Sequence, residues 1–169
     1  MTNWPLVKRL ALLWLGYKLG LNKDFDLKGL VVHVERYGSQ SLYQRTSLLK
    51  SDGKTRRTIW LPNPELKYVQ SAINRMLQRD FNRHANAFGF SGGRIHELLN
   101  LHTESKWMLT WDIKDAFDNT SARHAVKQLR ECYSYWVTQF ILELTFLSEG
   151  EIVDLSSFKG LPQGGITSP

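Results

Sequence analysis

The sequence predicts a single domain of the α+β class, and three patterns in its 169 residues support that class. Apolar residues recur every three or four positions in several stretches, which indicates amphipathic helices. Two short runs flank Asp52-Gly53, a dipeptide typical of tight β-hairpin turns. Apolar and polar residues alternate between 107 and 113, as they do in a half-buried strand. A chain of this length can bury a sizeable core in one domain.

The N-terminal part is predicted to hold two helical segments and then the hairpin. A helix is expected over 4–19, and a short helical or irregular piece over 26–37. Residues 41–50 and 55–61 predict the two strands, joined by Ser51-Asp52-Gly53-Lys54.

Asn63 and Pro64 mark the start of the next helix, because Asn is a common N-cap and Pro fits the first helical position. A loop over 84–93 and a further helix over 94–104 are expected to follow. The helix after Pro64 should bury a stripe at helical spacing, formed by Leu66, Val69, Ile73, Leu77 and Phe81.

The last third predicts a strand over 107–113, a long helix from about residue 119 to Leu147, and a short strand over 151–155. The second half of the long helix is apolar enough for a core position. Thr167-Ser168-Pro169 resembles a helix start, with a Ser cap and then Pro. We therefore expect the sequence to be a fragment of a longer fold or a truncated product.

Charge is distributed unevenly along the chain. Residues 1–60 hold eleven Lys and Arg against four acids, whereas residues 101–169 hold six against nine. This split suits an enzyme that binds a polyanion and also holds a cation, although an ordinary solvated surface would look the same.

A single cysteine, Cys132, excludes an internal disulfide and suits a reducing, cytoplasmic location. The apolar run from Leu10 to Leu21 is too short to span a bilayer, so no membrane association is expected.

Three acids, Asp112, Asp115 and Asp118, fall within seven residues at the end of the predicted strand. Like charges this close repel each other unless water separates them or a cation lies among them. The acids therefore either fan outward on a turn or help to build a metal site.

Basic residues gather at the hairpin tip, where Lys50, Lys54, Arg56 and Arg57 lie. Such a group is either a solvated turn or a contact surface for phosphates, which arginine can bind through two hydrogen bonds. Later in the chain, Gln163 precedes Gly164-Gly165 in a tight turn that allows close approach to a ligand.

Several separate motifs follow one another in a specific order. The basic hairpin is followed by Leu61-Pro62-Asn63-Pro64-Glu65-Leu66-Lys67 and by a loop with Ser91-Gly92-Gly93-Arg94. Asp112-Ile113-Lys114-Asp115-Ala116-Phe117 and Leu161-Pro162-Gln163-Gly164-Gly165 come next. This series resembles bacterial reverse transcriptases of the retron and group II intron-like branch, over about residues 41–169.

The resemblance implies a right-hand polymerase fold, of which this chain would supply the fingers and part of the palm. Residues 1–40 would be an N-terminal helical segment, 41–105 the fingers and 106–169 a partial palm. The fingers would be a β-hairpin with helices, and the palm would contribute its first strands.

The resemblance also implies roles for individual residues. Asp112 would be the catalytic, metal-binding aspartate, with the Ile113 carbonyl as a further ligand of Mg²⁺, or of Mn²⁺ as the alternative ion. Lys50 and Arg57 would hold the triphosphate, although Arg56 leaves the register ambiguous by one residue. Asp115, Ala116, Phe117 and Gln163 would surround the nucleotide, with Phe117 as the gate against a 2′-hydroxyl. Nucleic-acid contacts are expected from Lys54, Arg56, Arg94 and Gly164.

The implied activity is RNA-directed DNA polymerisation, with an RNA template, a primer and deoxynucleoside triphosphates as partners and a cognate structured RNA as a further candidate. The family's second carboxylate motif, aromatic-x-Asp-Asp, does not occur in these 169 residues. We therefore expect the chain alone to be inactive. A non-catalytic nucleic-acid-binding module and one piece of a split enzyme stay open as alternatives.

Overall fold

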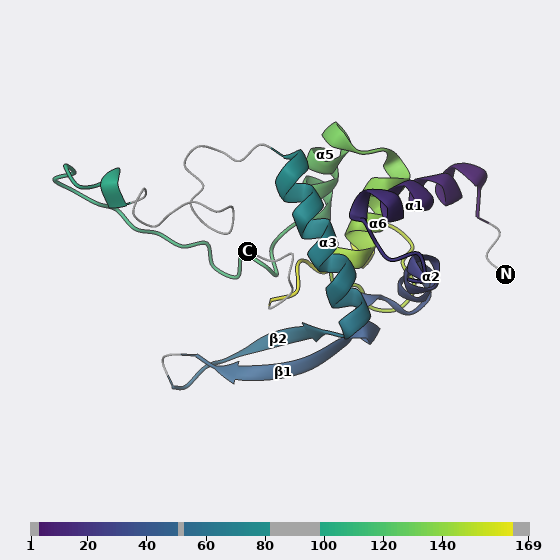
Figure 1. The fold of residues 1–169 in the computed structure, drawn as a ribbon. Coiled ribbons are helices and arrows are strands. Elements are labelled where there is room, and N and C mark those ends of the chain that lie inside the picture. The colour runs from purple at the N-terminus through teal and green to yellow at the C-terminus, as the bar shows by residue number, and fades with distance from the viewer. Residues whose placement is uncertain (1–3, 51–52, 82–98, 164–169) are drawn as a thin grey trace.

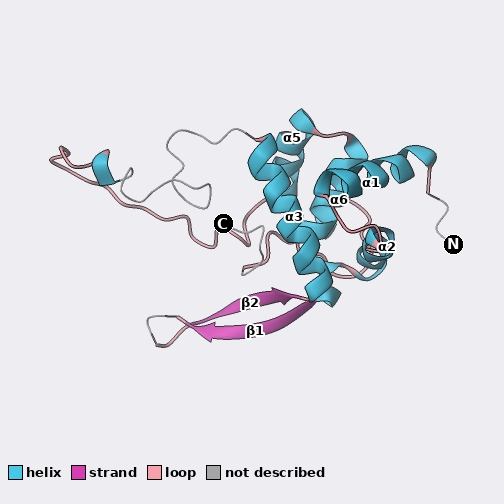
Figure 2. Cartoon of the chain, viewed as in Figure 1, coloured by secondary structure: helices cyan, strands magenta, loops and turns pink. Residues whose placement is uncertain are grey.

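In the computed structural model, which describes residues 4–50, 53–81 and 99–163, helices form a body from which one β-hairpin projects (Figure 1). The strands β1 (Tyr43–Leu49) and β2 (Arg56–Pro62) form a two-stranded antiparallel sheet (Figure 2). The mixture of helices and strands confirms the α+β class. The helices are α1 (Leu6–Leu19), α2 (Leu27–Tyr37), α3 (Pro64–Asp80), α5 (Ala122–Cys132) and α6 (Tyr135–Thr145).

Helix α6 lies at the centre of the core. It packs against α1, α2, α3 and α5, so its side chains are covered on nearly every side. This environment explains its apolar composition, and the predicted core position of the segment is confirmed. Its most buried apolar residues, each at most 2% exposed, are Val137, Phe140, Ile141, Leu142 and Leu144.

Helix α3 begins as its sequence predicts. The Asn63 side chain accepts a hydrogen bond from the Leu66 amide at 2.8 Å, and Pro64 occupies the first helical position. Gln70 then ties this helix to its neighbours, because its side-chain amide donates to the Tyr43 hydroxyl and to the Leu144 carbonyl. The base of the hairpin is thereby joined to the core.

A small group of charged residues, two of them buried and one half-buried, lies inside the helical body. Lys8 forms an ion pair with Glu35, and its Nζ lies 4.4 Å from the centre of the Trp4 ring. Glu143 on α6 is only 2% exposed. Burial, assisted by the negative charge of Glu35, raises the pKa of Glu143 to about 8.

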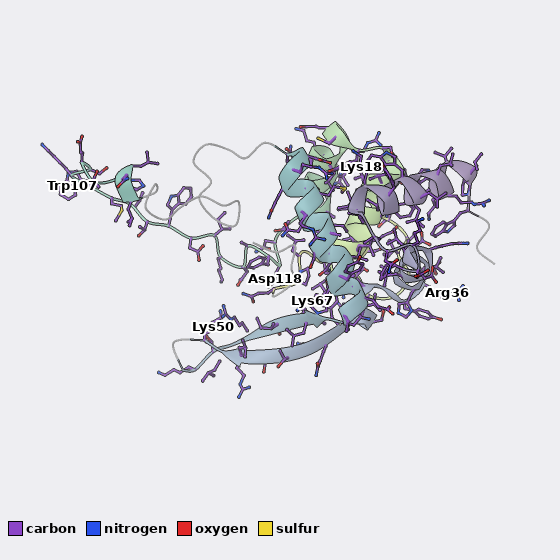
Figure 3. The ribbon with its side chains drawn as sticks, in the orientation of Figure 1. Lys18, Arg36, Lys50, Lys67, Trp107 and Asp118 are labelled. Carbon is purple, nitrogen blue, oxygen red and sulfur yellow. The ribbon has the colours of Figure 1, made fainter. Side chains whose placement is uncertain are left out.

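The predicted palm strands over 107–113 and 151–155 are wrong. Residues 107–113 have no regular structure and project away from the helical body, with Trp107 92% exposed (Figure 3). A strand needs a hydrogen-bonding partner, and no described segment pairs with this one. At 151–155, the Asp154 side chain instead accepts from the Ser156 amide at 2.7 Å and caps the short 3-10 turn Leu155–Ser157.

The single long helix expected between residue 119 and Leu147 is also wrong, because it is interrupted between α5 and α6. Tyr133 is extended there, with φ −127° and ψ 152°, and its hydroxyl donates to Asp80 at 2.9 Å. Its ring packs edge-on against Trp14 and Phe81. These tertiary contacts, together with Ser134 at the next cap position, outweigh helical continuity.

Some predicted elements fall partly or wholly outside the described ranges. The loop over 84–93 and the helix start at 167–169 lie outside them, as do residues 94–98 of the expected helix over 94–104. Residues 99–100 are helical and 101–104 form turns. No helix in the described ranges has the length and apolar content needed to cross a bilayer.

Candidate functional site

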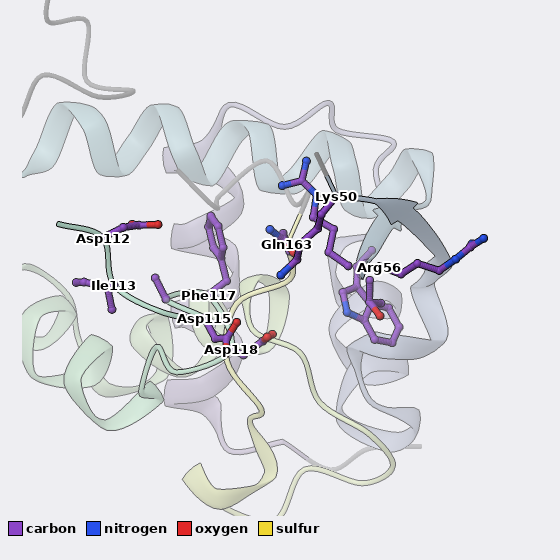
Figure 4. A pocket seen from close by; sticks show the side chains of 12 residues that line it. Lys50, Arg56, Asp112, Ile113, Asp115, Phe117, Asp118 and Gln163 are labelled. Carbon is purple, nitrogen blue, oxygen red and sulfur yellow. The ribbon is translucent and has the colours of Figure 1, made fainter. Parts of the chain in front are cut away.

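An open cavity of about 570 Å³ lies between the hairpin, the segment after residue 111 and the turn at Gln163 (Figure 4). Its volume falls within the range of small-molecule sites. Three stretches that are far apart in sequence line it: Lys50, Arg56, Arg57, Thr58 and Trp60; Asp112, Ile113, Asp115, Ala116, Phe117 and Asp118; and Gln163.

The acidic wall is a tight turn held by local hydrogen bonds. Asp115 has a positive φ of 51°, which is uncommon for a residue with a side chain. Its carbonyl accepts from the Asn119 amide at 3.0 Å, and the Thr120 hydroxyl donates to the Ala116 carbonyl at 2.8 Å. The turn carries Phe117 into the cavity, where its ring lies between Asp112 and Gln163 (Figure 4).

Residues 160–163 connect the acidic wall to the hairpin. The Leu161 amide donates to the Phe117 carbonyl at 3.0 Å. The Trp60 amide on β2 donates to the Gln163 carbonyl at 2.9 Å. Main-chain atoms therefore hold the two walls and the Gln163 turn in one frame.

The basic wall is set by the register of the hairpin. Leu48 pairs with Arg57 and Leu49 with Arg56. Because alternate strand residues point to opposite faces, Arg57 shares a face with Leu48, and Arg56 lies on the other. The Lys50 amide donates to the Thr55 carbonyl at 2.8 Å, which continues the pairing and places Lys50 on the Arg57 face.

The two adjacent arginines consequently have different surroundings. Arg56 borders the cavity, but its Nη1 donates to Ser47 Oγ on β1 at 3.2 Å. Figure 4 shows Lys50 reaching toward Gln163, while the Arg56 side chain runs away from the carboxylates. This geometry favours Arg57 over Arg56 as the partner of Lys50, an assignment that the sequence left open by one residue.

The cavity has opposite charges on its two sides. Lys50 and Arg57 approach from the hairpin, and Asp112, Asp115 and Asp118 from the other wall. None of these three acids is in an ion pair within the described part of the chain. A ligand that combines negative groups with a cation would match both sides.

The carboxylates fit a metal ion that is shared with a ligand better than an ion enclosed by protein alone. No group of three or more His, Cys, Asp or Glu in the described ranges could hold a metal ion by itself. Figure 4 shows Asp115 and Asp118 close together and Asp112 apart from them. Mg²⁺ commonly takes one or two carboxylates and completes its shell with phosphate oxygens and water. Asp112, as a single carboxylate lining the cavity beside Ile113, meets the lower end of that requirement.

The structure brings together every residue predicted to bind the metal or the nucleotide, and their roles stay predictions. Of the predicted nucleic-acid contacts, Arg56 borders the cavity, Lys54 is described but does not line it, and Arg94 and Gly164 lie outside the described residues. Sequence reasoning assigned no role to Thr58 or Trp60, which also line the cavity, and it left Asp118 open between a solvated turn and a metal site. Thr58 and Trp60 share a strand face with Arg56, and Arg57 lies on the other face, so both faces of β2 border the cavity and alternation alone would not have singled these two residues out.

Comparison with known proteins gives one result for function. A model of the family described as reverse transcriptase (RNA-dependent DNA polymerase) matches residues 48–169, which include every residue of the cavity. A search of curated proteins finds no match to the chain.

Proposed function

The chain belongs to the reverse transcriptase (RNA-dependent DNA polymerase) family, and we propose that its cavity is the site where such an enzyme binds the incoming deoxynucleoside triphosphate. The order of the motifs supports the retron and group II intron-like branch within that family. The RNA template and primer are the partners that this activity requires.

The observation that carries the proposal is the convergence of Lys50, Arg57, Asp112 and Gln163 on one cavity. Lys50 and Arg57 supply positive charge for a triphosphate, and arginine can bind phosphate oxygens through two parallel hydrogen bonds. Gln163 offers both a donor and an acceptor for the sugar or base. A nucleotide would thus contact both walls and the connecting turn at once.

The acidic wall supplies the metal site of the proposal. Asp112 and the Ile113 carbonyl would hold Mg²⁺ together with the phosphates. When bound, the ion neutralises phosphate charge and activates the attacking hydroxyl. Mn²⁺ also accepts carboxylate and phosphate oxygens and is the alternative ion.

Phe117 is proposed to close the cavity beside the sugar. Its ring enters the cavity from the 115–120 turn (Figure 4). A bulky ring next to the 2′ carbon leaves no room for a hydroxyl group, so the site would favour deoxynucleotides over ribonucleotides. Asp115 and Ala116 would form the floor beneath the sugar.

We propose that these 169 residues bind a nucleotide but do not polymerise. Two-metal phosphoryl transfer needs carboxylates that flank both ions. No two carboxylates are adjacent anywhere in the sequence, so the aromatic-x-Asp-Asp motif would have to come from additional residues or a second chain.

A second candidate function is a non-catalytic nucleic-acid-binding module. The hairpin supports it, because its sequence holds one acid, Asp52, against five basic residues: Arg45, Lys50, Lys54, Arg56 and Arg57. Such a surface can bind a phosphate backbone without any chemistry.

Calorimetric titration of the chain with a deoxynucleoside triphosphate, with and without Mg²⁺, separates the two functions. The proposal expects Mg²⁺-dependent binding that weakens about tenfold in Asp112→Asn, the loss of one charge-assisted contact. Asp24→Asn, which removes an exposed carboxylate outside the cavity, is the matched control and should bind as the wild type does.

Binding of a single-stranded oligonucleotide without any nucleotide binding would favour the non-catalytic module instead. Primer extension by this chain on an RNA template would overturn the proposed inactivity. Extension by a longer protein that adds an aromatic-x-Asp-Asp motif would support the enzymatic role.

A further inference from the structure

Gly160 lies against the main chain of the turn that carries Phe117. Its φ is +103°, a conformation that residues with a side chain rarely adopt. A methyl group on its Cα would lie 2.6 Å from the Asp118 carbonyl oxygen and 2.7 Å from that of Phe117. Both atoms belong to the backbone, so no side-chain rotation can relieve the overlap.

The surroundings of Gly160 determine which partner would have to move. The Gly160 carbonyl accepts from the Leu147 amide at 2.9 Å, and the Lys159 amide donates to the Leu147 carbonyl at 2.8 Å. Leu147 is 4% exposed and follows the central helix α6, so Gly160 is fixed to the core.

The turn on the other side is less firmly held. Asp115, Ala116 and Asp118 are exposed, and the positive φ of Asp115 already strains the turn. The Phe117 carbonyl accepts from the Leu161 amide at 3.0 Å and from the Thr120 amide at 3.2 Å. A side chain at 160 would therefore displace this turn, and with it the Phe117 ring, from its present position in the cavity.

We propose that Gly160 is a positioning residue for Phe117 and thereby sets how strongly the site distinguishes a deoxyribose from a ribose. This inference rests on the proposed nucleotide site. Gly160 does not line the cavity and acts through the backbone of residues 117–118. The close packing of Gly160 against the Phe117 and Asp118 carbonyl groups fixes the position of the Phe117 ring beside the sugar.

Gly160→Ala tests the proposal, with Gly150→Ala as the matched control. Gly150 also has a positive φ, of 69°, but a methyl group there would meet no atom within 4 Å. The measurement is the ratio of the dissociation constants of a ribonucleoside triphosphate and the matching deoxynucleoside triphosphate, each with Mg²⁺. The wild type and Gly150→Ala should favour the deoxynucleotide, and Gly160→Ala should shift the ratio toward one by about fivefold or more.

A general loss of structure would weaken the binding of both nucleotides equally and leave the ratio unchanged. Phe117→Ala supplies the second arm of the test, because it should bring the ratio near one by itself. If Gly160 acts through Phe117, adding Gly160→Ala to Phe117→Ala changes the ratio no further. An unchanged ratio in folded Gly160→Ala, or an equal shift in the Phe117→Ala background, would overturn the inference.

Thr120→Val is a second variant in case Gly160→Ala does not fold. It keeps Gly160 but removes the hydroxyl bond to the Ala116 carbonyl on the far side of the same turn. The ratio should move in the same direction, and an unchanged ratio would count against control by the turn. A wild-type chain that binds neither nucleotide contradicts the proposed nucleotide site itself, whereas equal binding of both nucleotides contradicts the proposed roles of Phe117 and Gly160 and leaves the nucleotide site standing.

Discussion

Arg56 and Arg57 are neighbours of equal charge, yet replacing Arg57 by alanine should weaken nucleotide binding far more than replacing Arg56. The register places them on opposite faces of the hairpin. Arg57 lies on the face of Lys50, whereas the Arg56 guanidinium is bonded to Ser47 across the strands. The pair therefore separates the effect of position from the effect of net charge.

The size of the difference follows from the type of contact. A charge-assisted hydrogen bond contributes about 1.5–3 kcal/mol, and the exposure of Arg57 places it near the lower value. A loss of about 1.5 kcal/mol weakens binding about tenfold. Arg56→Ala removes a charge that is already bonded to Ser47 and runs away from the carboxylates, so we expect a change within about twofold (Figure 4).

The assay is calorimetric titration of the wild type and both variants with a deoxynucleoside triphosphate and Mg²⁺, at low and at moderate salt. Urea unfolding of each variant checks that the fold is retained. Both side chains are exposed, so neither change should alter the free energy of unfolding by more than about 0.5 kcal/mol. Equal losses in the two variants, or a larger loss in Arg56→Ala, would refute the assignment of the Arg57 face to the triphosphate.

Two further predictions concern stability. Because burial raises the pKa of Glu143 to about 8, the folded chain keeps a proton that the unfolded chain loses near the ordinary value of 4.5. The free energy of unfolding should therefore fall as pH rises from about 5 to about 8, by at most ~1.4 kcal/mol per pH unit. Glu143→Gln should reduce this slope, as measured by urea unfolding at several pH values. A slope that the substitution leaves unchanged would contradict the role of Glu143. Asn63→Ala should lower the free energy of unfolding by about 1 kcal/mol through loss of the α3 cap, and unchanged stability would show that the cap contributes nothing.

Local signals in the sequence predicted the elements whose causes are themselves local. Asn63-Pro64 gave the start of α3 within one residue, and Asp52-Gly53 gave the hairpin, because capping and turn chemistry depend on neighbouring residues. The apolar composition of α6 predicted its burial, since no soluble surface accommodates that many large apolar side chains.

The errors arose where a distant contact decides the conformation. Alternation over 107–113 indicates which side chains share a face, but it cannot show whether a second strand lies alongside. Tyr133 ends α5 because Asp80, Trp14 and Phe81 receive its side chain. None of those residues is within fifty positions of it, so a helical pattern alone continues through the break.

The same distinction between local signals and distant contacts applies to the candidate site. Motif order predicted most of the residues that line the cavity, because the types of side chain needed for a triphosphate and a metal are restricted, but it did not predict Thr58 and Trp60. The choice between Arg56 and Arg57 required the strand register, which depends on pairing with β1. The role proposed for Gly160 could be inferred only from its contact with the backbone of residues 117–118. Nothing in the sequence around Leu161-Pro162 indicates that contact.

The frame of the cavity depends on main-chain atoms. The bonds from Leu161 to Phe117 and from Trp60 to Gln163 use only amide and carbonyl groups. The side chain of Gln163 is therefore free to contact a ligand, and its replacement would remove that contact without separating the two walls. Gly160 has no such freedom, because any side chain there meets the backbone of the opposite turn. In our proposals the four residues from Gly160 to Gln163 thus separate two tasks: glycine sets the position of the turn that carries Phe117, and glutamine contacts the ligand.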